Sequence, residues 1–203
     1  MVSAALLCRY RQLPIRYWKP IQTGIDQDDD TAEVRRLSAC DPTQVLDAGI
    51  RLPRPVSPHL AAKLNGSVVD VDALIALAAD QPVTDRWIVE GAGGVLVPLD
   101  NRMLLVDLIG RLNLPVLIVA RSGLGTINHT LLTIEALARR SIVIAGVVMV
   151  GPPDVENRLA IEQHGGIAVV GELPALSPLT PSALGQWADR ALDVHDRLTG
   201  YLT

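Results

Sequence analysis

The stretch Ile88-Val89-Glu90-Gly91-Ala92-Gly93-Gly94 joins an apolar strand to a glycine-rich turn. Such a strand ends at the carboxyl edge of a parallel sheet, where α/β proteins bind ligands. A carboxylate at that position, Glu90, is costly to bury unless it is paired or metal-bound. The glycines let bare main chain approach a charged group, and their N–H groups can surround an anion. The stretch therefore predicts a phosphate or carboxylate site with a metal ion nearby.

On both sides of this stretch the chain alternates between helical and strand patterns. The strands are apolar throughout, which is typical of strands covered on both faces. This order predicts an α/β fold, with a mostly parallel sheet between helices, in a single domain over residues 1–203. Helices are expected at residues 1–12, 30–38, from 57, 71–79, 103–112, 127–139, 155–164 and 182–198, and strands at residues 15–19, 87–90, 115–120, 142–150 and 167–170.

The composition is that of a packed globular protein. Of 203 residues, 49% are hydrophobic and 20% are charged, and with 3% aromatic residues and no Phe the core must be aliphatic. The net charge of −4 provides no basic surface for nucleic acid. No apolar run is long enough to span a bilayer, and Cys8 and Cys40 have neither zinc-site nor disulfide-framework spacing. We expect a soluble cytoplasmic protein with no nucleic-acid or membrane partner.

Other candidate residues follow the remaining strands. The first strand runs into Lys19-Pro20-Ile21-Gln22-Thr23-Gly24, and the strand at 115–120 runs into a glycine-bearing loop that begins a helix. Helix starts offer free N–H groups and a favourable dipole to an anion. Taken singly, Lys19 also fits a solvated surface lysine, and the acidic run from Asp26 to Asp30 also fits a solvated loop with a helix cap. Their convergence at one sheet edge favours a site.

Taken together, six stretches of the chain resemble the dethiobiotin synthetase family, in the family's order and along nearly the whole chain. They lie at residues 19–24 (KPIQTG), 30–34 (DTAEV), 57–59 (SPH), 89–94 (VEGAGG), 124–129 (LGTINH) and 171–174 (GELP). The resemblance implies a three-layer P-loop NTPase-like fold. It also implies an ATP-dependent ligase of biotin biosynthesis that joins carbon dioxide to 7,8-diaminononanoate. The carbamate so formed is phosphorylated by ATP and closed by the second amine to a cyclic urea.

The same resemblance assigns roles to individual residues. Lys19 corresponds to the catalytic lysine, and Asp30 and Glu90 correspond to Mg²⁺ ligands that neighbour the nucleotide. Phosphoryl transfer needs such charge stabilisation more than it needs a nucleophilic side chain. The implied homodimer brings a loop of one subunit to the substrate carboxylate of the other. The remaining expected contacts are Thr23, Gly125, Thr126 and Asn128 for substrate, and Gly91, Ala92, Gly93, Val150, Gly151, Pro174, Ala175 and Leu176 for nucleotide.

Two departures from the family pattern affect nucleotide binding. The family opens with a strand and a GxxxxxGK[ST] phosphate loop, whereas Met1–Leu7 here matches the helix that follows that loop. The missing strand is expected in the middle of the sheet, which leaves neighbouring strand edges unpaired. Where many relatives carry Asn-Asp, this chain has Val150-Gly151, so the nucleotide base has only main-chain groups near Pro174–Leu176 to contact.

Three interpretations follow. In the first, the natural protein has a further N-terminal segment and is a complete synthetase. In the second, the protein begins at Met1 and is a catalytically impaired relative that acts as a structural or regulatory module. The third is another P-loop amidoligase, such as a cobyrinate-amidating enzyme, although those enzymes add a glutaminase domain for which 203 residues leave no room.

Overall fold

Two three-stranded parallel sheets form the centre of the computed structural model, which describes residues 1–82 and 85–202. In the first sheet, β1 (Ile15–Trp18) lies between β3 (Val45–Leu46) and β5 (Arg86–Val89). In the second, β7 (Ile144–Val150) lies between β6 (Val116–Arg121) and β8 (Val169–Leu173). β2 (Ile21–Thr23) and β4 (Ile50–Leu52) form a separate parallel pair.

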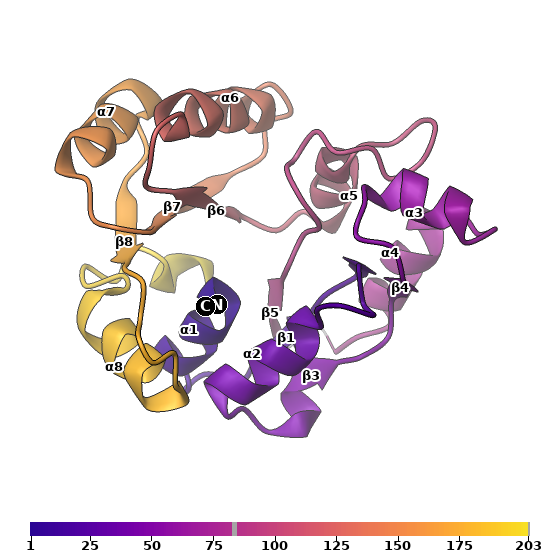
Figure 1. The fold of residues 1–203 in the computed structure, drawn as a ribbon, viewed down its shortest axis with the longest axis horizontal. Coiled ribbons are helices and arrows are strands. Elements are labelled where there is room, and N and C mark those ends of the chain that lie inside the picture. The colour runs from indigo at the N-terminus through magenta and orange to yellow at the C-terminus, as the bar shows by residue number, and fades with distance from the viewer. Residues whose placement is uncertain (83–84, 203) are drawn as a thin grey trace.

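Helices cover both faces of these sheets. In Figure 1, α6 and α7 lie on one side of β6, β7 and β8, and α1 and α8 lie on the other. The bounds are α1 Val2–Arg9, α2 Asp30–Ser38, α3 Pro58–Leu64, α4 Val71–Ala79, α5 Leu105–Leu112, α6 Thr126–Ala138, α7 Val155–Gly165 and α8 Pro181–Ala191, with 3₁₀ turns η1 Pro42–Gln44 and η2 Thr199–Tyr201. The α/β class, the parallel pairing and the layered arrangement predicted from the sequence are confirmed.

Alternate residues of the buried strands supply different parts of the core. Along β7, Val147 and Met149 pack with the cluster under α6 and α7, whereas Val148 packs with the cluster under α1 and α8. Successive side chains of a strand point to opposite faces, so a strand covered on both sides must be apolar throughout. The continuous apolar runs in the sequence have this cause.

Several predicted bounds are wrong at their ends. The helix predicted at 1–12 ends at Arg9, and the one predicted at 103–112 begins only at Leu105, because Leu104 pairs with Pro98 as an isolated bridge. The short strands β2, β3 and β4 were missed. They have two or three residues each, too few to establish a period of two in the sequence.

The predicted helix 182–198 ends at Ala191, and Asp193 explains the early end. The main-chain N–H of Asp193 donates to the Val170 carbonyl at 2.7 Å, which directs the chain back to β8. Its buried carboxylate accepts from the Arg197 and Leu198 N–H groups, both at 2.8 Å, and from the Tyr10 hydroxyl. One side chain thus joins the C-terminal segment to Tyr10, the residue that follows α1, and so links two parts of the chain distant in sequence.

We expect Asp193→Ala to lower the free energy of unfolding by about 3 kcal/mol, because it removes several charge-assisted hydrogen bonds and leaves their donors buried. Asp196→Ala is the matched control, since its ion pair with Arg9 is exposed and should contribute less than about 1 kcal/mol. Urea denaturation monitored by tryptophan fluorescence measures both. Equal losses in the two variants would contradict the assignment of Asp193 as the anchor.

Candidate functional site

The ammonium group of Lys19 lies between two carboxylates. Its Nζ is 2.7 Å from Asp30 Oδ2 and 3.0 Å from Glu90 Oε1, and it also donates to the Gly91 carbonyl at 3.0 Å. The Lys19 side chain is only 6% exposed, against 36% for Asp30 and 27% for Glu90. A buried ammonium is tolerated only when it is paired in this way. The structure thus brings together three residues that the sequence placed on three separate segments.

Strand register and helix capping hold these three residues in place. Trp18 is paired with Val89 across β1 and β5, so Lys19 and Glu90 leave adjacent parallel strands at the same edge. The Glu90 N–H donates to the Trp18 carbonyl at 2.8 Å and continues the ladder by one step. Asp30 begins α2, and the preceding Asp29 caps that helix by accepting from the Ala32 N–H at 3.0 Å. The candidate acid is therefore Asp30, while its neighbour has a structural role.

Two further residues contact Glu90 and were not predicted from the sequence. The Ser3 hydroxyl, in the first turn of α1, donates to Glu90 Oε2, and the Tyr17 hydroxyl lies 3.3 Å from the same oxygen. Burial, and then the charges of Glu90 and Asp30, raise the pKa of the Tyr17 phenol well above its ordinary value. A hydroxyl two residues before Lys19 in a buried strand was the available signal for Tyr17. Nothing in the sequence indicated that Ser3 contacts Glu90, because only the packing of α1 brings the two residues together.

The glycine turn after Glu90 is shaped by close contacts. A Cβ on Gly91 would lie 3.1 Å from Leu105 Cδ2, and Gly93, with φ of +81°, would place a Cβ 3.1 Å from Val97 Cγ2. The left-handed conformation at Gly93 favours glycine over any residue with a side chain. Glu90, Gly91, Gly93 and Gly94 all line a cleft of about 1180 Å³ that continues between β5 and β6. The turn therefore presents main chain to an open space, as an anion site requires.

Thr23 ends β2, where it pairs with Leu52 of β4 and is half-buried. Its neighbour Gln22 is almost fully buried and donates its amide to the carbonyls of Asp28 at 3.0 Å and Thr23 at 3.3 Å. Gln22 thereby ties the strand to the loop that carries Asp30. The segment after Lys19 is thus an ordered strand, β2, which was not predicted from the sequence.

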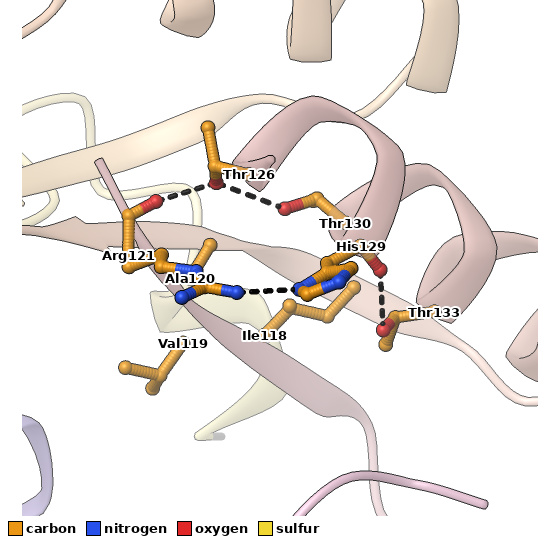
Figure 2. Close-up of a pocket in the computed structure, with 8 residues that line it drawn as sticks. All are labelled: Ile118, Val119, Ala120, Arg121, Thr126, His129, Thr130 and Thr133. Carbon is orange, nitrogen blue, oxygen red and sulfur yellow. Dashed lines mark hydrogen bonds between the residues drawn. The ribbon is translucent and has the colours of Figure 1, made fainter. Parts of the chain in front are cut away.

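The predicted substrate loop lies on the other sheet. A cavity of about 310 Å³ between β6 and α6 is shown in Figure 2, where the Arg121 guanidinium reaches the His129 ring at 2.9 Å. Thr126 is buried, and its hydroxyl donates to the Arg121 carbonyl at 2.5 Å. Gly125 and Asn128 are exposed. Nothing in the described part of the chain places these residues in contact with Lys19, Asp30 or Glu90.

The predicted base-binding residues gather at the carboxyl ends of β7 and β8. Val150 pairs with Leu173, and the Gly151 N–H donates to the Leu173 carbonyl at 2.9 Å. Pro174, Ala175 and Leu176 follow directly. Gly151, with φ of +130°, would place a Cβ 2.3 Å from Ser122 Oγ, so a side chain here requires Ser122 to move. The sequence correctly placed these segments at one edge, although their role in base binding stays a prediction.

The donor set around Lys19 fits a magnesium ion. Asp30 and Glu90 present carboxylate oxygens that both lie within 3.0 Å of one nitrogen, and with Lys19 they carry a formal charge of −1. Mg²⁺ is commonly held by one or two carboxylates together with waters and phosphate oxygens. No group of three or more His, Cys, Asp or Glu side chains suited to a metal occurs among residues 1–82 and 85–202. The arrangement therefore suits a metal shared with a phosphate ligand.

The chain is similar to known proteins along most of its length. A family model described as an AAA domain matches residues 1–183. The chain is 44% identical to an ATP-dependent dethiobiotin synthetase BioD of Paramagnetospirillum magneticum, over 91% of this chain and 85% of that protein. It is 42% identical to an ATP-dependent dethiobiotin synthetase BioD of Agrobacterium fabrum, over 86% of this chain and 80% of the relative. It is also 42% identical, over 91% of its length, to a biotin biosynthesis bifunctional protein BioCD of Bordetella avium, of which it covers 39%. Within the described ranges, no helix combines the length and the apolar character that crossing a membrane requires.

We expect the free energy of unfolding to fall as the pH rises above about 10, because unfolded Tyr17 then ionises while the folded phenol keeps its proton. Below about pH 10 the Tyr17 phenol makes its full contribution to the free energy of unfolding. The fall for this group is at most about 1.4 kcal/mol per pH unit. Urea denaturation between about pH 9 and about pH 11 should give a shallower dependence for Tyr17→Phe than for the unmodified protein. If the free energy of unfolding depends on pH equally in Tyr17→Phe and in the unmodified protein, Tyr17 does not cause the loss of stability at high pH.

Proposed function

The chain belongs to the dethiobiotin synthetase family, and we propose on this premise that it catalyses the ATP-dependent ring closure of 7,8-diaminononanoate with carbon dioxide to dethiobiotin. The observation that carries the proposal is the position of Lys19, a buried ammonium at hydrogen-bond distance from Asp30 and Glu90 at one sheet edge. A cation and two acids that converge beside a glycine turn suit the transfer of a phosphoryl group.

The reaction divides into three steps. One amine of the substrate adds to carbon dioxide and loses a proton, which gives a carbamate. A carbamate oxygen attacks the terminal phosphorus of ATP, and the bond to the departing ADP breaks. The second amine then attacks the carbamyl carbon and loses a proton, and phosphate leaves as the cyclic urea closes. Since the first step is an addition to carbon and the other two are displacements at phosphorus and at carbon, the protein has to supply positioning and charge stabilisation.

We assign Lys19 to the transferring phosphoryl group, where its ammonium offsets the negative charge that develops in the transition state. Asp30 and Glu90 would hold Mg²⁺, which supplies charge neutralisation between the phosphates when it is bound. The main chain of Gly91, Ala92 and Gly93 adjoins the phosphate and the carbamate. Ser3 and Tyr17 keep Glu90 oriented through its second oxygen.

The base of ATP is assigned to the edge formed by Val150, Gly151, Pro174, Ala175 and Leu176. Two main-chain bonds hold this edge together, from Ser122 to Val150 at 3.0 Å and from Gly151 to Leu173 at 2.9 Å. Neither Val150 nor Gly151 has a polar side chain, so recognition of the base falls to carbonyl and N–H groups. We place the protein in the cytoplasm, where ATP and bicarbonate are available.

Substrate binding is proposed to need two copies of the chain. Thr23 contacts the substrate beside Lys19, while the carboxylate of the substrate is bound by the loop of a second subunit that carries Gly125, Thr126 and Asn128. The exposure of Gly125 and Asn128, and their lack of contact with Lys19 in the described chain, support this division. Leu124 in this loop is fully exposed, and Leu132 on the helix α6 that follows it is 54% exposed; a partner subunit would cover these apolar side chains.

Lys19→Ala should lower kcat by about 10²- to 10³-fold, because a charge partner of the transition state is lost. Lys63→Ala is the matched control, since Lys63 is the other lysine of the chain and lies exposed on α3. Dethiobiotin formation is measured by mass spectrometry and ADP release by a coupled assay, with ATP, Mg²⁺, bicarbonate and diaminononanoate present.

ADP release that requires both bicarbonate and diaminononanoate supports the synthetase. Equal rates for Lys19→Ala and Lys63→Ala would remove Lys19 from the mechanism. Dimerisation without turnover, or turnover with another carboxylic substrate, would instead favour the regulatory module or a different amidoligase.

Leu132→Asp should convert the proposed homodimer to a monomer, because it places a charge in an apolar contact. Leu64→Asp is the control, as Leu64 has the same 54% exposure but lies on α3. Light scattering after size-exclusion chromatography gives the mass of each variant. A dimer that persists in Leu132→Asp, or a monomer for the unmodified chain, would contradict this surface as the interface.

A further inference from the structure

The two carboxylate oxygens of Glu90 have different surroundings. Oε2 accepts from the Ser3 hydroxyl and, at 3.3 Å, from the Tyr17 hydroxyl, whereas Oε1 accepts from Lys19 Nζ at 3.0 Å. An ionised carboxylate offers about four lone-pair positions, which are shared equally between its oxygens. The two hydroxyls therefore fill the positions on Oε2, and the position that is left for a further ligand is on Oε1.

Both hydroxyls are fixed by the elements that carry them. Ser3 is buried in the first turn of α1, where the next two residues, Ala4 and Ala5, are completely buried. Tyr17 is also completely buried, in the middle strand β1, where it pairs with Val45 of β3 and Ile88 of β5. A ligand that took the place of either hydroxyl would have to move a packed helix or a paired strand. The occupation of Oε2 is therefore built into the fold.

Lys19 fixes the other oxygen of Glu90. An ammonium group has three donors, and here they reach Asp30 Oδ2 at 2.7 Å, Glu90 Oε1 at 3.0 Å and the Gly91 carbonyl at 3.0 Å. Lys19 thus holds one oxygen of Asp30 and one of Glu90 close together. Ser3, Glu90 and Gly91 all line the cleft between β5 and β6. A cation that enters from this cleft can bind Glu90 through Oε1 only.

The number of oxygens that Glu90 offers affects which divalent cations fit. Ca²⁺ takes roughly six to eight oxygen ligands, and these often include both oxygens of one carboxylate. Mg²⁺ demands near-octahedral geometry and is usually held by one or two carboxylates together with waters and phosphate oxygens. Coordination through both oxygens needs a lone pair on each, and on Oε2 both positions are taken. Glu90 therefore suits Mg²⁺ better than Ca²⁺.

We infer that Ser3 and Tyr17 select Mg²⁺ over Ca²⁺ at the candidate site, because their hydroxyls occupy Glu90 Oε2 and restrict Glu90 to one coordination bond. Ser3 and Tyr17 are positioning residues, since they act on the cation through Glu90. The inference rests on the proposed function, which assigns Mg²⁺ to Asp30 and Glu90, and adds a selection between cations. Hydroxyls that only oriented Glu90 would strengthen the binding of both cations by the same factor.

Competition against Mn²⁺, which also favours octahedral oxygen sites, measures this selection. The electron paramagnetic resonance signal of free Mn²⁺ is lost when the ion binds, and the Mg²⁺ or Ca²⁺ concentration that restores half of it gives the relative affinity. In the unmodified protein we expect Ca²⁺ to need about tenfold more than Mg²⁺. Ser3→Ala with Tyr17→Phe should remove most of this difference, since partners of metal ligands change metal affinity by about tenfold or more.

Ser67→Ala with Tyr201→Phe is the matched control, because both of these residues are exposed and it removes the same two kinds of hydroxyl. The control should keep the ratio of the unmodified protein. Each of the single variants Ser3→Ala and Tyr17→Phe should shift the ratio toward Ca²⁺ by less than the double variant does. Equal affinity of the unmodified protein for Mg²⁺ and Ca²⁺ would overturn the inference. Mg²⁺ and Ca²⁺ affinities that fall by the same factor in the double variant would overturn it as well.

Infrared spectroscopy tests the unmodified protein directly. With isotope-labelled Glu carboxylates, the separation between the antisymmetric and symmetric stretching bands narrows when a cation binds both oxygens of one carboxylate. Addition of Ca²⁺ should not narrow this separation in the unmodified protein and should narrow it in the variant that lacks the Ser3 and Tyr17 hydroxyls. Narrowing in the unmodified protein would show that Oε2 of Glu90 is accessible to the cation, which contradicts the inference.

Asp30→Asn separates a failure of this inference from a failure of the proposed function. This variant should bind no Mn²⁺, because it removes one of the two acids assigned to the metal. If Mn²⁺ still binds to Asp30→Asn, or does not bind to the unmodified protein, the metal assignment of the proposed function is wrong and the inference falls with it. If Asp30→Asn abolishes binding but the Ser3 and Tyr17 hydroxyls leave the Mg²⁺-to-Ca²⁺ ratio unchanged, the inference alone is wrong.

Discussion

The burial of one ammonium group, that of Lys19, constrains most of the structure around it. A charge that is 6% exposed needs compensating charge within hydrogen-bond distance, and Asp30 and Glu90 supply it from α2 and from the end of β5. Register between β1 and β5 then has to be exact, because a slip of one residue would turn Glu90 to the other face. Because the buried Lys19 needs Glu90 as a charge partner, a lysine at position 19 requires that β1 and β5 pair in this register.

The same cluster explains how the site can work without a nucleophilic side chain. Lys19, Asp30 and Glu90 together carry a formal charge of −1, which leaves an attraction for a cation in addition to the lysine. Ser3 and Tyr17 occupy the second oxygen of Glu90, so the first is oriented toward Lys19. Hydrogen bonds to a carboxylate in a low-dielectric setting hold it more firmly than they would in water. Preorganised charge of this kind is what phosphoryl transfer requires.

The division of the sheet affects the site as well as the stability. Glu90 and the glycine turn line the cavity between β5 and β6, so the candidate site opens into a space lined largely by apolar side chains. Open strand edges leave backbone groups without ladder partners, and they are sites at which chains associate. The helices α1 and α8 keep the two sheets in one molecule, since they pack with residues of β1, β7 and β8 in one core cluster. Packing therefore provides the continuity that the strand ladder lacks.

The order of the helices and of the longer strands, and the choice of candidate residues at the carboxyl ends of those strands, followed from the sequence alone, because periodicity, glycine turns and caps act over a few residues. Lys19, Asp30 and Glu90 were predicted on this basis, and the register of β1 with β5 places them together. Tertiary structure alone decided that Ser3 and Tyr17 contact Glu90, that α8 ends at Ala191, that the loop of Gly125 lies on the other sheet and that a cleft separates β5 from β6. Each of these depends on contacts between residues far apart in the chain, and local pattern carried a signal only for Tyr17, as a hydroxyl in a buried strand.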